Sequence, residues 1–290
     1  MPLLPLLAAP DEVAAVLDDP RLRVLDATVR LERPAGGGPY EVVSGIDGYR
    51  AGHVPGAAFA DVAGALADPD APHPFALPTP VRFAAGAGDL GIGPDLHVVV
   101  YAQESPMWAT RLWWLLRAFG FDAVSVLDGG LPAWRAAGLP VRTGDESYAT
   151  AEFAARPRPE LVASQADVER IVDGGGACLV NALRPEVFRG EGPSCYSRPG
   201  RIPGSVNVPW TGLVDPDTNR FRPANELVAA LAAGGVPDDE PLVAYCGGGI
   251  SATVDLFALT LAGRPDGRLY DGSLTEWTAD PSLPVEVGPA

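Results

Sequence analysis

The chain has 290 residues, 47% of them hydrophobic, and a formal net charge of −16 from 37 acidic and 21 basic residues. This length allows two domains of ordinary size, each with its own core. No basic block could follow a phosphate backbone and no apolar run has membrane-spanning length, which argues against nucleic-acid and membrane partners.

Cysteine and histidine are scarce, with three residues of each type. Cys178, Cys195 and Cys246 do not form a disulfide framework, and no Cys/His cluster has metal-ligand spacing, so we expect neither a metal site nor a cofactor. The N-terminal stretch is apolar but lacks the basic region of a signal peptide. Together these features predict a protein of the reducing cytoplasm.

The first half of the chain alternates helix and strand patterns. Residues 10–17 have the apolar spacing of a helix, and residues 23–27 form a short apolar strand pattern. A second strand is predicted at Val98–Tyr101, followed by a helical stretch, and a last strand precedes Asp128 and Gly129. This alternation is typical of an α/β unit with a parallel sheet.

The second half repeats this order. A helix is predicted over 164–172, where Ser164 and Asp167 resemble a capping box, and strands are predicted at 178–182 and 241–245. A helix then runs from Ser251 toward Gly263, and a short strand precedes Asp271 and Gly272. The segment 144–159 between the halves contains Arg156-Pro-Arg-Pro159 and has little periodicity, which indicates a linker.

Four short matches in the same order identify the chain as a tandem duplication. They pair Val54-Pro-Gly-Ala57 with Ile202-Pro-Gly-Ser205, Val98–Tyr101 with Leu242–Tyr245, Leu127-Asp-Gly-Gly130 with Tyr270-Asp-Gly-Ser273, and Leu139-Pro-Val141 with Leu283-Pro-Val285.

Cys246 is the strongest candidate for a catalytic residue. It follows an apolar strand and is followed by Gly247, Gly248 and Gly249, then Ile250 and the predicted helix from Ser251. Backbone N–H groups of such a loop, together with the positive end of the helix dipole, favour a thiolate, which is the nucleophilic form of cysteine. A buried cysteine more often acts as a small hydrophobic residue. Three consecutive glycines favour the reactive interpretation, because glycine there is costly unless the backbone needs it.

These motifs together resemble the tandem-domain rhodanese family of sulfurtransferases, over nearly the whole chain. The landmarks are Gly52–Ala57, its diverged copy Gly200–Ser205, Asn207–Trp210, the Cys246 loop and Trp277. The resemblance implies an α/β fold of two tandem rhodanese-like domains, each a mainly parallel sheet flanked by helices. We expect a non-catalytic domain over residues 1–145 and a catalytic domain over residues 160–290, since Ala102 stands at the position that corresponds to Cys246.

Within this family the loop resembles the 3-mercaptopyruvate branch, whose pattern is Cys-Gly-Ser-Gly-Val-Thr. The resemblance implies that a small anionic donor, 3-mercaptopyruvate, passes its sulfur to Cys246 as a persulfide. A thiol acceptor such as thioredoxin or a sulfur-carrier protein, or cyanide, then removes it. The thiosulfate branch usually carries basic residues after the cysteine, and fixed positive charge favours a small dianion. The neutral loop therefore favours 3-mercaptopyruvate over thiosulfate.

The predicted donor-binding residues depart from the family at several points. Gly247, Gly248, Gly249, Ile250 and Ser251 form the loop, and Gly248 replaces a serine that is thought to assist proton movement. Val187 replaces an arginine that commonly binds the donor carboxylate. The nearby Arg184, Arg189, Arg198 and Arg201 are possible substitutes, although each is on base rates more often a solvated surface residue. We include Arg184 and Arg189 in the predicted site.

Two first-half residues, His73 and Asp61, resemble family positions near the domain interface. We expect the Cys246 site to face the first domain and to receive these two groups, although a histidine between prolines is more often simply exposed. Cys195 lies in a Gly/Pro/Ser-rich segment that we expect to border the site, either as a resolving thiol or as a bystander.

Three alternatives remain open at this point. The first is that the protein is a thiosulfate sulfurtransferase. The second is that it is a persulfide carrier, which serves a biosynthetic partner without turning over by itself. A class of phosphatases also shares the cysteine-loop architecture, but it needs a longer loop that ends in an arginine. No arginine follows Cys246 within the loop, which argues strongly against phosphatase activity.

Overall fold

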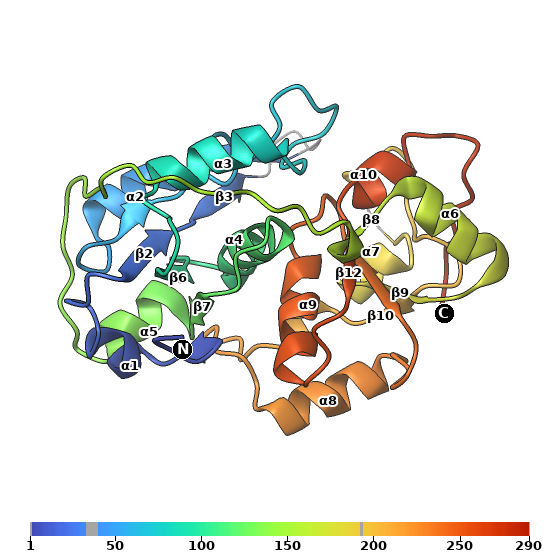
Figure 1. Cartoon of the computed structure of the whole chain (residues 1–290). Helices are drawn as coiled ribbons and strands as arrows, with labels where there is room; N and C mark the ends of the chain where they lie inside the picture. The colour runs from blue at the N-terminus through green and yellow to red at the C-terminus, as the bar shows by residue number, and fades with distance from the viewer. Residues whose placement is uncertain (1, 33–39, 192–193, 290) are drawn as a thin grey trace.

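The computed structural model describes residues 2–32, 40–191 and 194–289. Two α/β halves lie side by side in it (Figure 1). The elements of the first half are β1 (Leu7–Ala8), α1 (Pro10–Ala14), β2 (Leu22–Asp26), β3 (Val29–Glu32), β4 (Glu41–Ser44), α2 (Ile46–Ala51), β5 (Ala58–Phe59), α3 (Pro80–Asp89), β6 (His97–Tyr101), α4 (Pro106–Ala118), β7 (Val124–Leu127) and α5 (Gly130–Ala136).

The second half repeats most of these elements in the same order. They are the short 3₁₀ helix η1 (Pro159–Leu161), β8 (Val162–Ala163), α6 (Gln165–Gly174), β9 (Cys178–Asn181), α7 (Pro185–Phe188), β10 (Val206–Asn207), the 3₁₀ helix η2 (Trp210–Gly212), α8 (Ala224–Ala233), β11 (Leu242–Tyr245), α9 (Ala252–Leu261), β12 (Arg268–Tyr270) and α10 (Ser273–Trp277).

Each half contains a five-stranded parallel sheet, and the two sheets have the same topology. The strand order is β1-β7-β6-β2-β5 in the first and β8-β12-β11-β9-β10 in the second, when both are read from the same edge. All pairings within these sheets are parallel. The antiparallel hairpin β3–β4 is an insertion in the first half. The predicted fold class, a tandem pair of parallel α/β units, is therefore confirmed.

The predicted elements are found, with small shifts at their ends. The first helix ends at Ala14, three residues before the predicted end, and a turn follows it. The capping box at α6 is present: Asp167 N–H donates to Ser164 Oγ at 3.2 Å and Ser164 N–H donates to Asp167 Oδ2 at 2.8 Å. Within the predicted linker 144–159, residues 144–158 contain no helix and no strand, and Pro159 begins η1.

Alternate side chains of the central strands point to opposite sides of each sheet. Both faces therefore present apolar groups, and both are covered. Val98 and Val100 of β6 belong to one buried cluster, and Val99 and Tyr101 belong to another. The first of these clusters continues into the second half through α4 and α9. At this contact Trp113 and Phe257 meet edge to face, with ring centroids 4.9 Å apart. The two halves therefore share one continuous apolar core.

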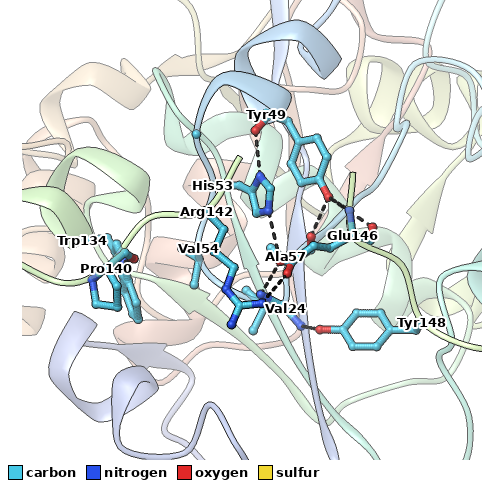
Figure 2. A network of polar contacts seen from close by, with 12 residues as sticks. Val24, Tyr49, His53, Val54, Ala57, Trp134, Pro140, Arg142, Glu146 and Tyr148 are labelled. Carbon is cyan, nitrogen blue, oxygen red and sulfur yellow. Dashed lines mark hydrogen bonds and ion pairs between the residues drawn. The ribbon is translucent and has the colours of Figure 1, made fainter. Parts of the chain in front are cut away.

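A polar network anchors the start of the linker to the first half (Figure 2). The buried His53 ring lies between Tyr49 O, at 2.9 Å from Nδ1, and Glu146 Oε2, at 3.1 Å from Nε2. The same carboxylate accepts from Gly56 N–H at 2.6 Å and from Arg142 at 2.9 Å. The second half has a related arrangement: Arg201 stands at the position of His53 and pairs with Glu286, which stands at the position of Arg142, and the same antiparallel bridge joins these two positions in each half. This correspondence supports the duplication.

Candidate active site

Cys246 lies at the carboxyl end of the central strand β11, where ligand sites of parallel α/β sheets are found. Its residue surface is 2% exposed. Residues 247–251 then turn the chain into α9, and Ile250 and Ser251 are buried as well. The strand, cysteine, loop and helix follow each other as the sequence predicts.

Ser273 holds the two ends of this loop together. Its hydroxyl accepts the N–H of Cys246 at 3.0 Å and the N–H of Gly249 at 3.1 Å, and it donates to Tyr270 O at 2.8 Å. Ser273 has a φ of +51°, an uncommon value for a residue with a side chain. The N–H groups of the next two residues, Leu274 and Thr275, donate to the carbonyl oxygens of Cys246 and Gly247, and the Thr275 hydroxyl also donates to Gly247 O. The sequence analysis did not identify Ser273, although the repeat aligned it with Gly130.

The remaining N–H groups of the loop are available to a ligand. Among the described residues, no hydrogen-bond partner is found for the backbone N–H of Gly247, Gly248, Ile250 or Ser251. These donors precede the ten-residue helix α9, whose dipole adds positive potential at the same end. The loop is therefore suited to hold a negative charge beside the Cys246 sulfur.

The three glycines of the loop differ in how strictly they are required. Gly249 has a φ of +73°, and a Cβ there would stand 2.6 Å from Asp271 Oδ1. A Cβ on Gly247 would stand 2.1 Å from the hydroxyl oxygen of Tyr196. Gly248 is more open, since among the described residues Thr275 Oγ1, at 3.8 Å, is the one atom within 4 Å of its Cβ position. Two of the three glycines are thus explained by close approach of other groups.

The first half contributes Arg111 to the loop. This buried arginine of α4 donates to Gly249 O at 3.1 Å, to Asp271 Oδ1 at 2.5 Å and to Phe75 O at 2.5 Å. Asp271 also accepts from Leu77 N–H at 2.7 Å. One guanidinium therefore connects three parts of the chain: the Cys246 loop, Asp271 just after β12, and the first-half segment that contains Phe75.

The helices α4 and α9 also contact each other close to the point where the loop leads into α9. Thr110 Oγ1 of α4 and Thr253 Oγ1, on the second residue of α9, are 2.8 Å apart. This contact and Arg111 together set how the loop and α9 lie against the first half. Sequence reasoning missed Arg111, because an arginine within a run of helix-forming residues gives no signal that it is buried.

Asp255 is a buried carboxylate in the first turn of α9. It is fully buried, and neither carboxylate oxygen has a hydrogen-bond partner among the described residues. The pKa of Asp255 lies well above its usual range because burial penalises the charged form and because the nearby charge of Cys246 opposes a second negative charge.

Tyr196 lies on the other side of the loop, against Gly247. Burial raises its pKa, and the nearby charge of Cys246 raises it further. Its ring also borders a small cavity of about 10 Å³, the volume of one water molecule, with Val187, Gly190 and Glu191. The sequence analysis placed the segment around Cys195 at the border of the site but did not identify Tyr196.

The arginines of the second half are held by other groups. Arg184 is exposed and lies 3.4 Å from Glu186, and Arg189 forms two bonds to Glu191, at 2.7 and 2.8 Å. Arg198 donates to four backbone carbonyls at the end of α10 and in the following segment. Arg201 is buried against Phe188 and pairs with Glu286. Among the described residues, no hydrogen bond or ion pair joins Arg184 or Arg189 to the Cys246 loop.

His73 and Asp61 belong to different parts of the first half. His73 lies two residues before Phe75, whose carbonyl bonds Arg111, so its segment reaches the neighbourhood of Asp271. The Asp61 carboxylate accepts the N–H groups of Gly64 and Ala65, at 3.0 and 3.3 Å, and thereby caps a turn.

The corresponding loop of the first half lacks the chemistry of the Cys246 site. Ala102 replaces the cysteine, Pro106 removes an N–H group, and Gln103 N–H is occupied by Thr28 Oγ1 at 2.9 Å. A hairpin of the second half covers this loop, with Asn219 Nδ2 donating to Glu104 O at 2.9 Å. The cavity that remains there has a volume of about 10 Å³.

Within residues 2–32, 40–191 and 194–289, no group of three or more His, Cys, Asp or Glu side chains is placed to hold a metal ion. In the same ranges, no helix is both long and apolar enough to cross a membrane.

Comparison with known proteins agrees with the duplicated fold. The rhodanese-like domain family matches residues 9–137 and again residues 165–280. A 3-mercaptopyruvate sulfurtransferase of Escherichia coli K12 is 37% identical over 284 residues, which cover 95% of this chain and 96% of that protein. A putative thiosulfate sulfurtransferase, SseB of Mycobacterium tuberculosis, is 36% identical over 278 residues, 92% of this chain and 91% of the relative.

A solved structure supports the same assignment. The crystal structure of SseA from Escherichia coli, described as a 3-mercaptopyruvate sulfotransferase with the rhodanese fold, superposes with a TM-score of 0.81 at 35% identity. The match covers 92% of this chain and 98% of that structure. Two family matches in tandem and relatives that align over nearly the whole length lead to one conclusion: this chain belongs to the rhodanese-like family and is a sulfurtransferase with two tandem domains.

Proposed function

We propose that the protein moves a sulfane sulfur from 3-mercaptopyruvate to an acceptor through a persulfide on Cys246. The observation that carries this proposal is the loop around Cys246, with four backbone N–H groups that have no partner among the described residues. These groups stabilise the thiolate before the reaction and the negative charge of the donor during it. The loop residues Gly247 to Ser251 are therefore the proposed donor-binding site.

The reaction has two halves. The Cys246 thiolate attacks the sulfur of the donor, the carbon–sulfur bond breaks, and pyruvate leaves. A thiol, such as that of thioredoxin or a sulfur-carrier protein, or cyanide then attacks the outer sulfur and regenerates Cys246. Because this cycle needs thiols, and Cys178, Cys195 and Cys246 are all thiols in the structure, we propose that it takes place in the reducing cytoplasm.

The donor preference follows from charge. The two relatives reported above have nearly the same identity to this chain but are named for different donors, so overall similarity does not decide the donor. No basic side chain belongs to the loop, which disfavours the small thiosulfate dianion relative to 3-mercaptopyruvate. Arg184 and Arg189 remain proposed carboxylate partners, and each would have to exchange a glutamate for the donor.

We also propose residues 1–145 and 160–290 as the two domains, with His73 and Asp61 as first-domain groups at the edge of the site. Support comes from the segment after His73, which reaches Asp271 through Leu77. Asp61 has weaker support, because its carboxylate already caps a turn.

Mass spectrometry of the intact protein tests this function. Exposure to 3-mercaptopyruvate without an acceptor should add one sulfur to Cys246, and Cys246→Ser should gain none and should not turn over. Thiosulfate should label the native protein more slowly. A Cys246→Ser variant that keeps substantial activity would overturn the proposal. A persulfide that forms once but is not released to thiol acceptors would identify a carrier rather than an enzyme.

Gly248 allows a direct test of the charge argument. Its Cβ position is open, whereas a side chain on Gly247 would collide with Tyr196. Gly248→Lys should therefore fold and shift the ratio of kcat/KM values toward thiosulfate by about tenfold, because it adds one positive charge beside the sulfur. Gly248→Gln is the uncharged control and should leave the ratio near that of the native protein.

A further inference from the structure

The hydroxyl of Tyr196 touches the backbone of the catalytic loop next to Cys246. A Cβ built on Gly247 would stand 2.1 Å from Tyr196 Oη and 2.9 Å from Cζ, so the hydroxyl lies where a side chain of the loop would otherwise be. The structure shows no hydrogen bond of this hydroxyl to any described residue, although the Tyr196 backbone is tied to Ser194 Oγ at 3.0 and 3.1 Å.

The loop has few side chains of its own that can donate a hydrogen bond. Gly247, Gly248 and Gly249 contribute none, and the space beside Gly248 is open. A phenol remains a donor only while it is protonated. The pKa of Tyr196 is raised by burial and by the neighbouring charge of Cys246, which favours a hydroxyl that keeps its proton.

We propose that Tyr196 is a catalytic residue whose hydroxyl contacts the donor beside Cys246 and donates a hydrogen bond to its keto oxygen. This role rests on the proposed function, because it needs a donor that carries a carbonyl next to the carbon–sulfur bond.

The negative charge that develops on 3-mercaptopyruvate explains why a hydrogen-bond donor is needed at this point. The Cys246 thiolate forms a bond to the sulfur of 3-mercaptopyruvate, and the electron pair of the carbon–sulfur bond passes to the carbon. The organic product is first the enolate of pyruvate, with its charge on the former keto oxygen. Tyr196 stabilises that oxygen by a hydrogen bond and stays protonated, while a proton from solvent completes pyruvate. The sulfur remains as Cys246–S–SH, and no redox partner is required.

The test is the rate of pyruvate release in a single turnover without acceptor, with the Cys246 persulfide measured by mass spectrometry. Tyr196→Phe keeps the ring that borders the small cavity but loses the hydroxyl. We expect the rate at saturating donor to fall about 10²-fold, with little change in the donor concentration for half-saturation, because the bond forms to charge that develops only as the reaction proceeds.

Tyr148→Phe is the matched control. Its partly buried hydroxyl accepts the N–H of Val24 (Figure 2), and no hydrogen bond of the described residues joins it to the loop. This variant should react at the native rate. Gly248→Ser in the Tyr196→Phe background places a hydroxyl in the open space beside the loop, and it should recover part of the lost rate.

The outcomes separate this proposal from the function on which it rests. A native rate in Tyr196→Phe, with normal persulfide formation, would overturn the role of Tyr196 and leave the proposed function intact. A slow rate that the Gly248 serine fails to restore, together with a lowered unfolding midpoint, would show a structural role and also overturn it. Absence of a Cys246 persulfide in the native protein would instead overturn the function itself.

Discussion

At the residue scale, the catalytic loop depends on glycine at one position much more than at its neighbour. Gly249 combines a positive φ with a Cβ position 2.6 Å from the Asp271 carboxylate, whereas the nearest atom at Gly248 is 3.8 Å away. The same residue type therefore has two different roles within two positions. The backbone path requires glycine at 249 and does not require it at 248.

Alanine substitutions distinguish these two roles. Gly249→Ala should lower kcat/KM by more than about tenfold and destabilise the protein by about 1–3 kcal/mol, because the methyl group collides with Asp271 and the φ is unfavourable. Gly248→Ala, the matched control, should stay within about 0.5 kcal/mol of the native stability. Steady-state kinetics and urea unfolding measure both effects, and equal losses in the two variants would contradict this account.

Asp255 links stability to pH. Its pKa is raised in the folded protein by burial and by the charge of Cys246, so the folded state keeps a proton that the unfolded chain releases above about pH 4. The contribution of this residue to stability is complete below that pH. It is lost as the pH rises toward the folded pKa, with a slope of up to about 1.4 kcal/mol per pH unit.

Asp255→Asn should remove this dependence. The variant should gain stability relative to the native protein as the pH is raised from 5 to 8, which urea unfolding at several pH values would show. The exposed Asp238→Asn is the control and should follow the native curve. A difference between Asp255→Asn and native protein that does not change with pH would refute the linkage.

At the scale of elements, α4 of the first half positions the Cys246 loop. Arg111 reaches from this helix to Gly249 O, Asp271 and Phe75 O. The planar guanidinium can satisfy these acceptors together, whereas an ammonium group at the same place is shorter and cannot span them. A buried ion pair that loses one partner leaves an uncompensated charge, which costs several kcal/mol.

Arg111→Lys should therefore lower both stability and the rate of Cys246 persulfide formation, the latter by about tenfold or more. Arg117→Lys is the matched control on the same helix, since Arg117 packs on Trp113 near Asp122 and does not contact the loop. Thermal unfolding and single-turnover mass spectrometry would measure the two effects. A normal rate in Arg111→Lys would show that the first half does not position the loop.

At the scale of the whole molecule, the charge opposes the proposed donor. The chain has a net charge of −16, and 3-mercaptopyruvate is an anion, so the field around the protein slows their encounter. The local N–H groups of the loop act only at short range, after the donor has arrived. Salt screens the long-range repulsion and leaves a buried site nearly unaffected.

Because the repulsion acts at long range and the loop N–H groups act at short range, added salt should change the encounter with the donor but not the reaction in the site. Between about 20 and 200 mM NaCl, kcat/KM for 3-mercaptopyruvate should rise about two- to threefold, while kcat stays nearly constant. Thiosulfate, with its second charge, should show a larger rise. A decrease of kcat/KM with salt would mean that a positive surface near the site attracts the donor.

The two halves also share one apolar core across α4 and α9, where Trp113 meets Phe257 and Thr110 meets Thr253. This contact makes the duplicated chain a single packed molecule (Figure 1). Through α4, the first half also forms part of the support of the Cys246 loop.

The duplication, the order of helices and strands, and the loop at Cys246 could all be predicted from the amino-acid sequence. Local patterns carry this information: apolar periodicity, a capping box at Ser164, and a cysteine followed by glycines. Only the tertiary structure revealed Arg111, Ser273, Tyr196 and Asp255. Each is distant in sequence from Cys246 or buried without a local signal, and its role depends on which groups the packing of two halves brings together. For the same reason Arg184 and Arg189, which lie near the expected positions in sequence, are paired with glutamates instead.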